Sequence, residues 1–243
     1  VSMRTEQGIS DQAVYVILGY DLNGGKDVLG LWIGDTESKH RWMQVFDEIK
    51  SRGVQDIGFI SMDGVSGLED GAKAIFKNVV VQRCIVHLIR NSLKYVPSKD
   101  YKAFTSQLKK IYGAINLKGA QAEFERFCDT WNKYPGAIRV WKDNFRHVEQ
   151  LFNYGSDVRR VMYTTNAIES VNSSFRKVTK QGAFSSETAI FKVFYLRIKE
   201  LYQKWRGHSI RNWAMVMNQL VIDERIGTMV QKYGSSLACV GKN

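Results

Sequence analysis

The sequence contains little proline or cysteine and has no long apolar segment. Only two prolines, together with scattered glycines, argue against long disordered or collagen-like stretches. The three cysteines, Cys84, Cys128 and Cys239, are far apart and form no CxxC pair, so no disulfide framework is expected and the reducing cytoplasm is the compartment that fits. No run approaches about 18 apolar residues, which excludes a membrane-spanning helix, and the opening VSMRTEQGIS lacks the apolar core of a signal peptide.

Acidic residues are also in deficit. There are 24 Asp and Glu against 35 Lys and Arg, which gives a formal net charge of +11. A folded chain this basic typically meets a polyanion, and we favour nucleic acid as its partner. The alternative is a basic surface that is merely solvated. Hydrophobic residues make up 44% of the chain, enough for one large core or for a core domain with an insertion.

The first third of the chain carries strand signals. β-rich runs on either side of the turn DLNGGK predict a β-hairpin over 13–34. Apolar residues at helical spacing predict a helix over 38–53, with Ser38 as its cap and Gly53 as its stop. Short strands are expected within 54–64 and 79–82, with a short helix at 68–77 between them.

Beyond residue 83 apolar residues recur every three to four positions, which predicts helices. The predicted helices are 100–115, 117–134, 137–152, 165–180, 187–205 and 210–226. A hairpin followed by alternating strands and helices predicts an α/β domain with a mixed sheet. The expected organisation is a first part of the core at 1–95, an α-helical insertion at 96–160, C-terminal core helices at 161–226 and a loose tail at 227–243.

Two acidic residues stand where chemistry would be expected. Asp63 ends the predicted strand IGFISMD, and functional groups in α/β sheets gather at the carboxyl ends of strands. Glu169 lies at the start of a predicted helix, and Asn172 and Arg176 share its face. Each acid has an ordinary alternative: Asp63 as a helix cap, and Glu169 as part of a capping box with Asn166.

The residues after Glu169 favour the functional interpretation. A basic strip follows it, formed by Arg176, Lys177 and Lys180. A carboxylate beside such a strip suits a metal-dependent phosphodiester site, because the acid binds the cation and the bases hold the DNA backbone.

The stretch RCIVHLIRN, residues 83–91, allows three interpretations. Cys84 and His87 could be half of a zinc site, but no second pair stands at ligand spacing. They could be a nucleophile and its base, but no acyl-transfer signature accompanies them. On a helix the stretch would place a basic stripe on one side, facing phosphates or simply solvated. The stripe consists of Arg83, His87, Arg90 and Lys94.

Together these motifs resemble the bacterial Mutator-type transposases of insertion sequences. The likeness rests on DVLGLWIGDTES, MDG, QRCIVHLIRN and YTTNAIESVNSSFRKVTK, and it runs from about residue 1 to 226. It implies an RNase H-like (retroviral-integrase-like) core, a mixed sheet with an α-helical insertion. It also implies a DDE mechanism, in which three carboxylates hold two Mg²⁺ or Mn²⁺ ions that activate the attacking oxygen and stabilise the leaving oxygen.

The resemblance assigns roles to particular residues. Asp63 matches the second carboxylate and Glu169 the third, and both would bind metal. Cys84 and His87 match a C-x-x-H signature. The first carboxylate is expected a few residues before Val1, so the chain as given is expected to be inactive or nearly so.

The resemblance also implies partners and leaves two alternatives. The partners are DNA at the element ends and the target, and further copies of the protein, since two DNA ends must be brought together. A location at the nucleoid in the cytoplasm follows. The alternatives are a transposase remnant that binds DNA without cutting it, and an RNase H-like nuclease or resolvase.

Overall fold

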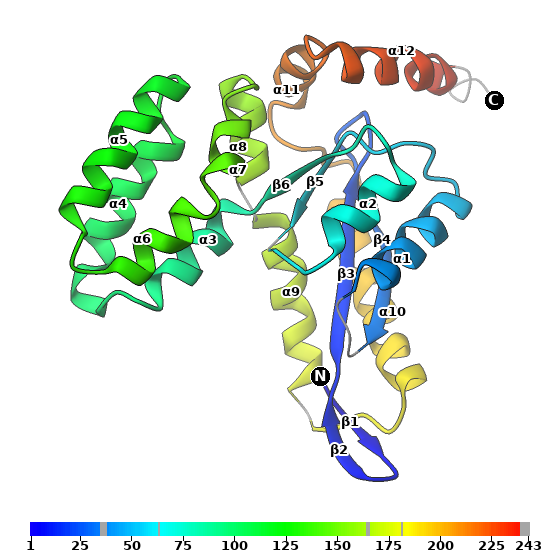
Figure 1. Ribbon diagram of the computed structural model, residues 1–243. Coiled ribbons are helices and arrows are strands. Elements are labelled where there is room, and N and C mark those ends of the chain that lie inside the picture. The colour runs from blue at the N-terminus through cyan, green and yellow to red at the C-terminus, as the bar shows by residue number, and fades with distance from the viewer. Residues whose placement is uncertain (35–37, 63, 164–165, 181, 239–243) are drawn as a thin grey trace. The chain divides into compact units, whose positions relative to one another are not determined.

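The protein is a mixed α/β chain that divides into two compact units (Figure 1). The computed structural model describes residues 1–34, 38–62, 64–163, 166–180 and 182–238. The first unit comprises Val1–Gly58, Val65–Val79 and Asn166–Asn243, and the second comprises Phe59–Gly64 and Val80–Thr165.

The first unit is built around an antiparallel hairpin, which confirms the prediction for 13–34. Strand β3 (Ala13–Tyr20) pairs with β4 (Lys26–Gly34), with a register shift between Ile17 and Leu18. The turn is tight because Oδ1 of Asp21 accepts 2.8 Å hydrogen bonds from the backbone N–H groups of Asn23 and Gly25. Such side-chain-to-backbone bonds are how aspartate stabilises turns.

Helices pack on both faces of this hairpin. Val14, Val16 and Leu18 alternate along β3 and contact a core formed with α9 (Asn166–Thr179) and α10 (Glu187–Trp205). Tyr15 points the other way, and its ring meets Trp42 of α1 edge-on at 5.3 Å. Because successive side chains of a strand point to opposite faces, alternate residues of β3 contact the two helical layers.

Helices α1 (Lys39–Ser51) and α2 (Leu68–Ile75) form the second layer of the first unit. The predicted cap of α1 is confirmed, because Oγ of Ser38 accepts a hydrogen bond from the N–H of Arg41 at 3.2 Å. The helix buries Trp42, Val45, Phe46 and Ile49, the residues whose spacing predicted it.

The second unit combines two parallel strands with a helical block. Strand β5 (Phe59–Met62) pairs with β6 (Val80–Arg83), and α3 (Ile85–Leu93) follows. The helices after it pack around buried aromatic rings, with Phe104 5.0 Å from Phe127. These elements are the 3₁₀ turn η1 (Ser98–Asp100), α4 (Tyr101–Tyr112), α5 (Leu117–Thr130), α6 (Pro135–Lys142), α7 (Phe145–Leu151) and α8 (Ser156–Tyr163).

Some elements differ from those predicted. The segment 137–152 is not one helix but two, α6 and α7, and 210–226 likewise divides at the end of α11 (Trp213–Leu220). A second hairpin, β1 (Ser2–Thr5) with β2 (Gly8–Asp11), was not anticipated. In the described residues the six strands pair only in twos: β1 with β2, β3 with β4, and β5 with β6.

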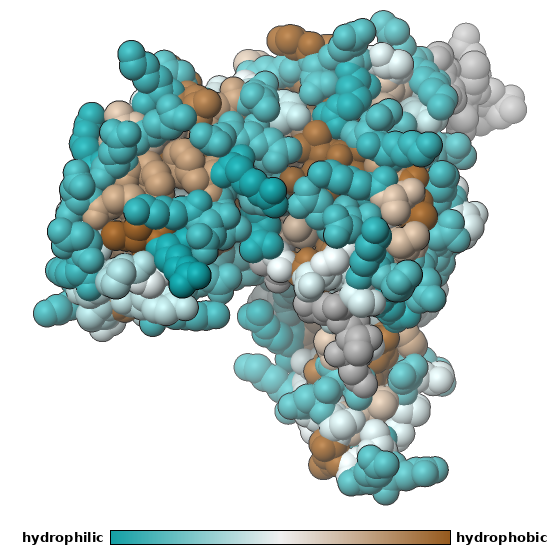
Figure 2. Space-filling view, viewed as in Figure 1, coloured by the Kyte–Doolittle hydropathy of each residue, from teal (hydrophilic) through white to brown (hydrophobic). Residues whose placement is uncertain are grey.

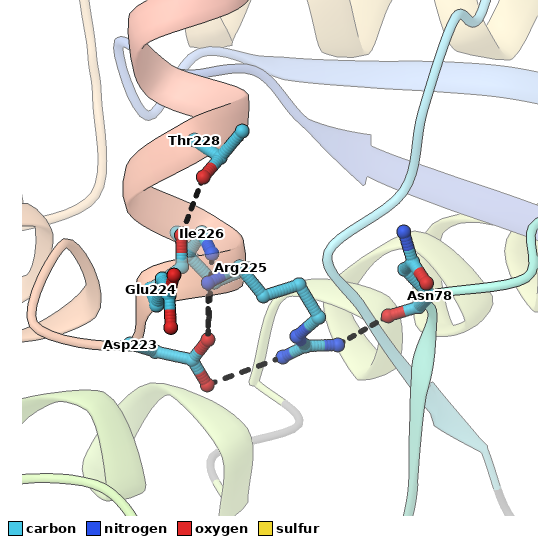
Figure 3. Close-up of polar contacts among 6 residues, drawn as sticks. All are labelled: Asn78, Asp223, Glu224, Arg225, Ile226 and Thr228. Atoms are coloured by element: carbon cyan, nitrogen blue, oxygen red, sulfur yellow. Dashed lines mark hydrogen bonds and ion pairs between the residues drawn. The ribbon is translucent and has the colours of Figure 1, made fainter.

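The segment expected as a tail is helical as far as Ala238. Helix α12 (Glu224–Ala238) begins at Asp223, whose Oδ1 accepts hydrogen bonds from the N–H groups of Arg225 and Ile226 (Figure 3). The guanidinium of Arg225 pairs with Asp223 at 3.4 Å and donates to the carbonyl of Asn78. An aspartate cap and a guanidinium anchor thus fix where α12 starts.

The visible surface is mostly hydrophilic, with smaller hydrophobic areas between the polar side chains (Figure 2). Within the described part of the chain, no helix is long and apolar enough to cross a membrane.

Candidate functional site

Glu169 lies in the first turn of α9 and is half-buried. The opposite face of the helix anchors it, since Val171 and Phe175 belong to the core beneath the hairpin. Successive helix residues turn by about 100°, so Glu169 lies roughly opposite Val171. The carboxylate is therefore directed to the polar side of a helix that the core holds in place.

The basic residues predicted to follow Glu169 lie along that helix. Arg176 and Lys177 are exposed in the last turn of α9, and Lys180 is exposed just after it. Arg176 shares the face of Glu169, as the sequence spacing predicted, at about 10 Å along the helix axis. Asn172, on the same face, is half-buried.

A contact that the sequence did not reveal joins α9 to α10. Nε of Arg197 donates a 2.6 Å hydrogen bond to Oγ of Ser174, which is buried. One turn away the rings of Phe175 and Phe194 stack at 4.5 Å. Ser174 is neither apolar nor charged, so its residue type did not predict burial. The only sequence signal was its position between Val171 and Phe175, which belong to the core.

Tyr202 of α10 is hydrogen-bonded to strand β4 of the hairpin. Its hydroxyl donates a 2.5 Å hydrogen bond to Oδ1 of Asp27 and accepts one from the N–H of Val28 at 3.3 Å. Burial and then the neighbouring Asp27 carboxylate raise the pKa of Tyr202 to about 12. The phenol therefore stays neutral and keeps its donor role.

In the second unit β5 and β6 end at the same edge. Met62 pairs with Arg83, and the N–H of Cys84 donates a 2.6 Å hydrogen bond to the carbonyl of Met62. Parallel strands that end together place the residues that follow them close in space. Asp63, the predicted carboxylate that follows Met62 in the sequence, lies outside the described residues.

Arg83 is the last residue of β6, not part of a helical stripe as predicted, because the chain remains extended through residue 83. Its guanidinium lies against Gly64, which has a φ of +93°. A Cβ at position 64 would overlap that guanidinium, so glycine is required both for the backbone conformation and for the space.

The rest of the predicted stripe is on α3. Arg90 is exposed on that helix and Lys94 is exposed at its C-terminal cap. Cys84 is buried, as expected for a residue that packs inward, and His87 is half-buried. Nδ1 of His87 is shielded from solvent and has no hydrogen-bond partner among the described residues.

Gln82 is a further polar residue that sequence reasoning missed. It is only 1% exposed, and its Nε2 donates a 2.7 Å hydrogen bond to the carbonyl of His147. This buried bond ties β6 to α7 within the second unit. Its sequence signal was a single polar residue in the apolar run VVVQ.

Of the two predicted acids, Glu169 lies within the described residues. Over the ranges that the structure describes, which exclude Asp63, no three His, Cys, Asp or Glu side chains group to hold a metal. Among the described residues, Cys84 and Cys128 form no disulfide. A zinc site at Cys84 and His87 therefore has no third ligand among the described residues.

Comparison with known proteins gives one consistent family. The family model described as "Transposase, Mutator family" matches residues 1–208. A probable transposase for the element ISRM3-like of Sinorhizobium fredii is 38% identical over 225 residues, covering 91% of this chain and 56% of the relative. The ISRM3 transposase of Rhizobium meliloti is 37% identical with the same coverage.

A probable insertion-element transposase of Corynebacterium diphtheriae is 36% identical over 243 residues, covering 91% of this chain and 71% of the relative. The chain spans about half the length of the two rhizobial relatives.

Proposed function

Because the chain belongs to the Mutator family of transposases, we propose that it forms the catalytic part of an insertion-sequence transposase. The proposed reaction cuts DNA at the element end and joins the freed 3′ hydroxyl to target DNA. The observation that carries the proposal is the family match over residues 1–208, which includes both predicted acids.

Glu169 is the carboxylate for which the structure offers most support. It lies on a helix held by core packing on one side, and exposed cations follow it along the same helix. A catalytic group must be held firmly, because small displacements from the productive geometry cost large factors in rate. The alternative of a capping box accounts for the position of Glu169 but not for the cations.

Asp63 and Glu169 would hold Mg²⁺ or Mn²⁺, since carboxylate oxygens are the ligands that these hard cations prefer. When bound, two such ions lower the pKa of the attacking hydroxyl or water and stabilise the leaving oxygen. The protein's own residues would orient the reacting phosphodiester. Arg176, Lys177 and Lys180 would neutralise phosphates on one side of Glu169.

Arg83, Arg90 and Lys94 would contact phosphates from the second unit. The RNase H-like core, assembly into a homo-oligomer and a location at the nucleoid belong to the same proposal. Joining two element ends to one target requires at least two active sites, which is the reason to expect more than one copy.

The test is a strand-transfer assay with Mg²⁺ or Mn²⁺ and DNA carrying the element ends. It uses a transposase that carries all three of the carboxylates that the resemblance implies. Glu169→Gln and Asp63→Asn are expected to abolish cleavage and joining while DNA binding persists. Glu187→Gln is the matched control, since Glu187 is an exposed glutamate in the first turn of a neighbouring helix.

Three outcomes separate the alternatives. Unchanged activity in Glu169→Gln contradicts the assignment of that residue. Binding of DNA by the wild type without cleavage favours the non-catalytic remnant. Cleavage without joining favours a nuclease or resolvase.

A further inference from the structure

The β3–β4 turn is held by a loop from the far end of the chain. Nε1 of Trp213 donates a 2.8 Å hydrogen bond to the carbonyl of Leu22, and the N–H of Ile210 donates to the carbonyl of Gly24 at 3.1 Å. The Trp213 ring also lies where a Cβ of residue 24 would be. Two hydrogen bonds and an aromatic contact thus build one surface from distant segments of the chain, with Trp213 and Leu22 separated by 191 residues.

This surface carries a shallow, open hollow of about 590 Å³. Among the described residues that line it, none is acidic. The lining residues are Leu22, Asn23 and the segment 207–214.

Basic residues border the hollow. Arg211 and His208 line it, and Arg206 immediately precedes it in the sequence; all three are exposed. Asp21 and Asp27 keep their negative charge while accepting hydrogen bonds from turn N–H groups and from Tyr202, but neither is among the residues that line the hollow.

The register of α9 and α10 relates the hollow to Glu169. Ser174 contacts Arg197 and Phe175 contacts Phe194, so the two helices run antiparallel. Glu169, five residues before Ser174, is therefore level with Tyr202, five residues after Arg197. Arg206 follows about 6 Å beyond that level. The hollow thus lies at the Glu169 end of the helix pair.

We propose that this hollow is a second contact for the DNA phosphodiester backbone, separate from the basic residues of α9. It would hold phosphates beyond Glu169, while Arg176, Lys177 and Lys180 hold those in the other direction. A concave surface with Arg211 in its lining, Arg206 next to it in the sequence and no acid among its described lining residues fits a polyanion better than it fits an apolar or cationic partner. The inference rests on the proposed function, since it takes DNA as the partner.

The test measures binding of the chain to a DNA duplex by fluorescence anisotropy, in EDTA and over a range of salt concentrations. The variant is Arg206→Gln with Arg211→Gln. The control is Lys109→Gln with Lys110→Gln, which removes the same charge from exposed positions on α4. Each lost phosphate contact lowers the slope of log K against log salt by about 0.9, so a decrease of about 2 is expected.

The affinity of the hollow variant at 0.1 M salt should fall by at least about tenfold, with the control close to wild type. Thermal unfolding checks that both variants fold. A second measurement places a photo-crosslinking amino acid at Asn23, in the hollow, or at Ile115, which is 93% exposed in the second unit. Crosslinks to DNA are expected from position 23 and not from position 115.

Equal losses in the two charge variants, a wild-type slope in the hollow variant, or no crosslink from position 23 would each overturn the inference. No cleavage is needed in these assays. If Glu169→Gln keeps its strand-transfer activity while the hollow variant loses binding, the catalytic assignment fails and the hollow stands. If Glu169→Gln is inactive and the hollow variant binds DNA normally, the catalytic assignment stands and the inference about the hollow fails.

Discussion

Nε of Arg197 donates a hydrogen bond of 2.6 Å to the buried Oγ of Ser174, and this bond ties the helix that carries Glu169 to its neighbour. The Arg197 side chain is only 18% exposed, and its other contact is an ion pair with Glu200. A charged donor on a buried acceptor makes a stronger bond than two neutral groups do. The bond therefore fixes the α9 side of the candidate site against α10.

Replacing Ser174 tests this contact. Ser174→Ala should lower the free energy of unfolding by about 1.5–3 kcal/mol, because the Arg197 guanidinium loses a partner in a largely buried position. Chemical denaturation measures the change. Ser173→Ala, the exposed neighbour in the same helix, should change stability by no more than about 0.5 kcal/mol. Equal effects of the two variants would show that the bond adds nothing.

Replacing Gly64 should displace the Arg83 guanidinium without preventing folding. Gly64→Ala and Gly53→Ala both place alanine at a positive φ, +93° and +111°, and each should cost about 1–3 kcal/mol of unfolding free energy. Only at position 64 does the new Cβ meet the Arg83 guanidinium, which must then move. Gly64→Ala should therefore weaken DNA binding, and Gly53→Ala should not.

The comparison includes its own check. In an Arg83→Ala background, Gly64→Ala should have no further effect on DNA affinity, measured by anisotropy. A further loss in that background would mean that Gly64 acts by some route other than Arg83.

Gln82 should stabilise the second unit through its buried amide. Gln82→Met keeps the length of the side chain but removes the buried hydrogen bond from Nε2 to the carbonyl of His147, so the free energy of unfolding should fall by about 1–3 kcal/mol. Gln121→Met, at an exposed position of α5, is the control and should be nearly neutral. Urea denaturation of both variants gives the comparison, and a neutral Gln82→Met would contradict the assigned role.

Tyr202 should make stability depend on pH in the alkaline range. Its pKa is raised from 10.0 to about 12, so the folded state holds the phenolic proton more tightly than the unfolded chain does. The stability gained from this is fully present below pH 10 and is lost as the pH rises to about 12. The stability difference between wild type and Tyr202→Phe should therefore shrink across this window.

Asp27→Asn tests how much the Asp27 carboxylate contributes to the raised pKa of Tyr202. Burial is the larger cause of the raised pKa and the Asp27 carboxylate the smaller. Removing the carboxylate should lower the raised pKa of Tyr202, so stability is lost over a narrower pH range. Because burial remains, the pKa should still lie above 10.0. If the difference in unfolding free energy between wild type and Tyr202→Phe stays constant between pH 9 and 12, Tyr202 is not the source of the pH dependence.

Local signals in the sequence were enough where neighbouring residues decide the structure. The turn DLNGGK and its flanking β-rich runs determined the hairpin, because Asp21 bonds the backbone two and four residues on. Ser38 and four apolar residues at helical spacing determined α1, because capping and amphipathic spacing act within one helix. The motifs around Cys84, His87 and Glu169 were likewise enough to predict the family.

Only the tertiary structure decided the features that depend on distant partners. The extended backbone of Arg83 follows from its pairing with Met62, the burial of Gln82 from the carbonyl of His147, and the role of Ser174 from Arg197. The basic hollow exists because Trp213 and Ile210 meet the β3–β4 turn. In each case the deciding group lies more than 20 residues away in the sequence, where no periodicity or cap signal reaches, and only packing brings the two together.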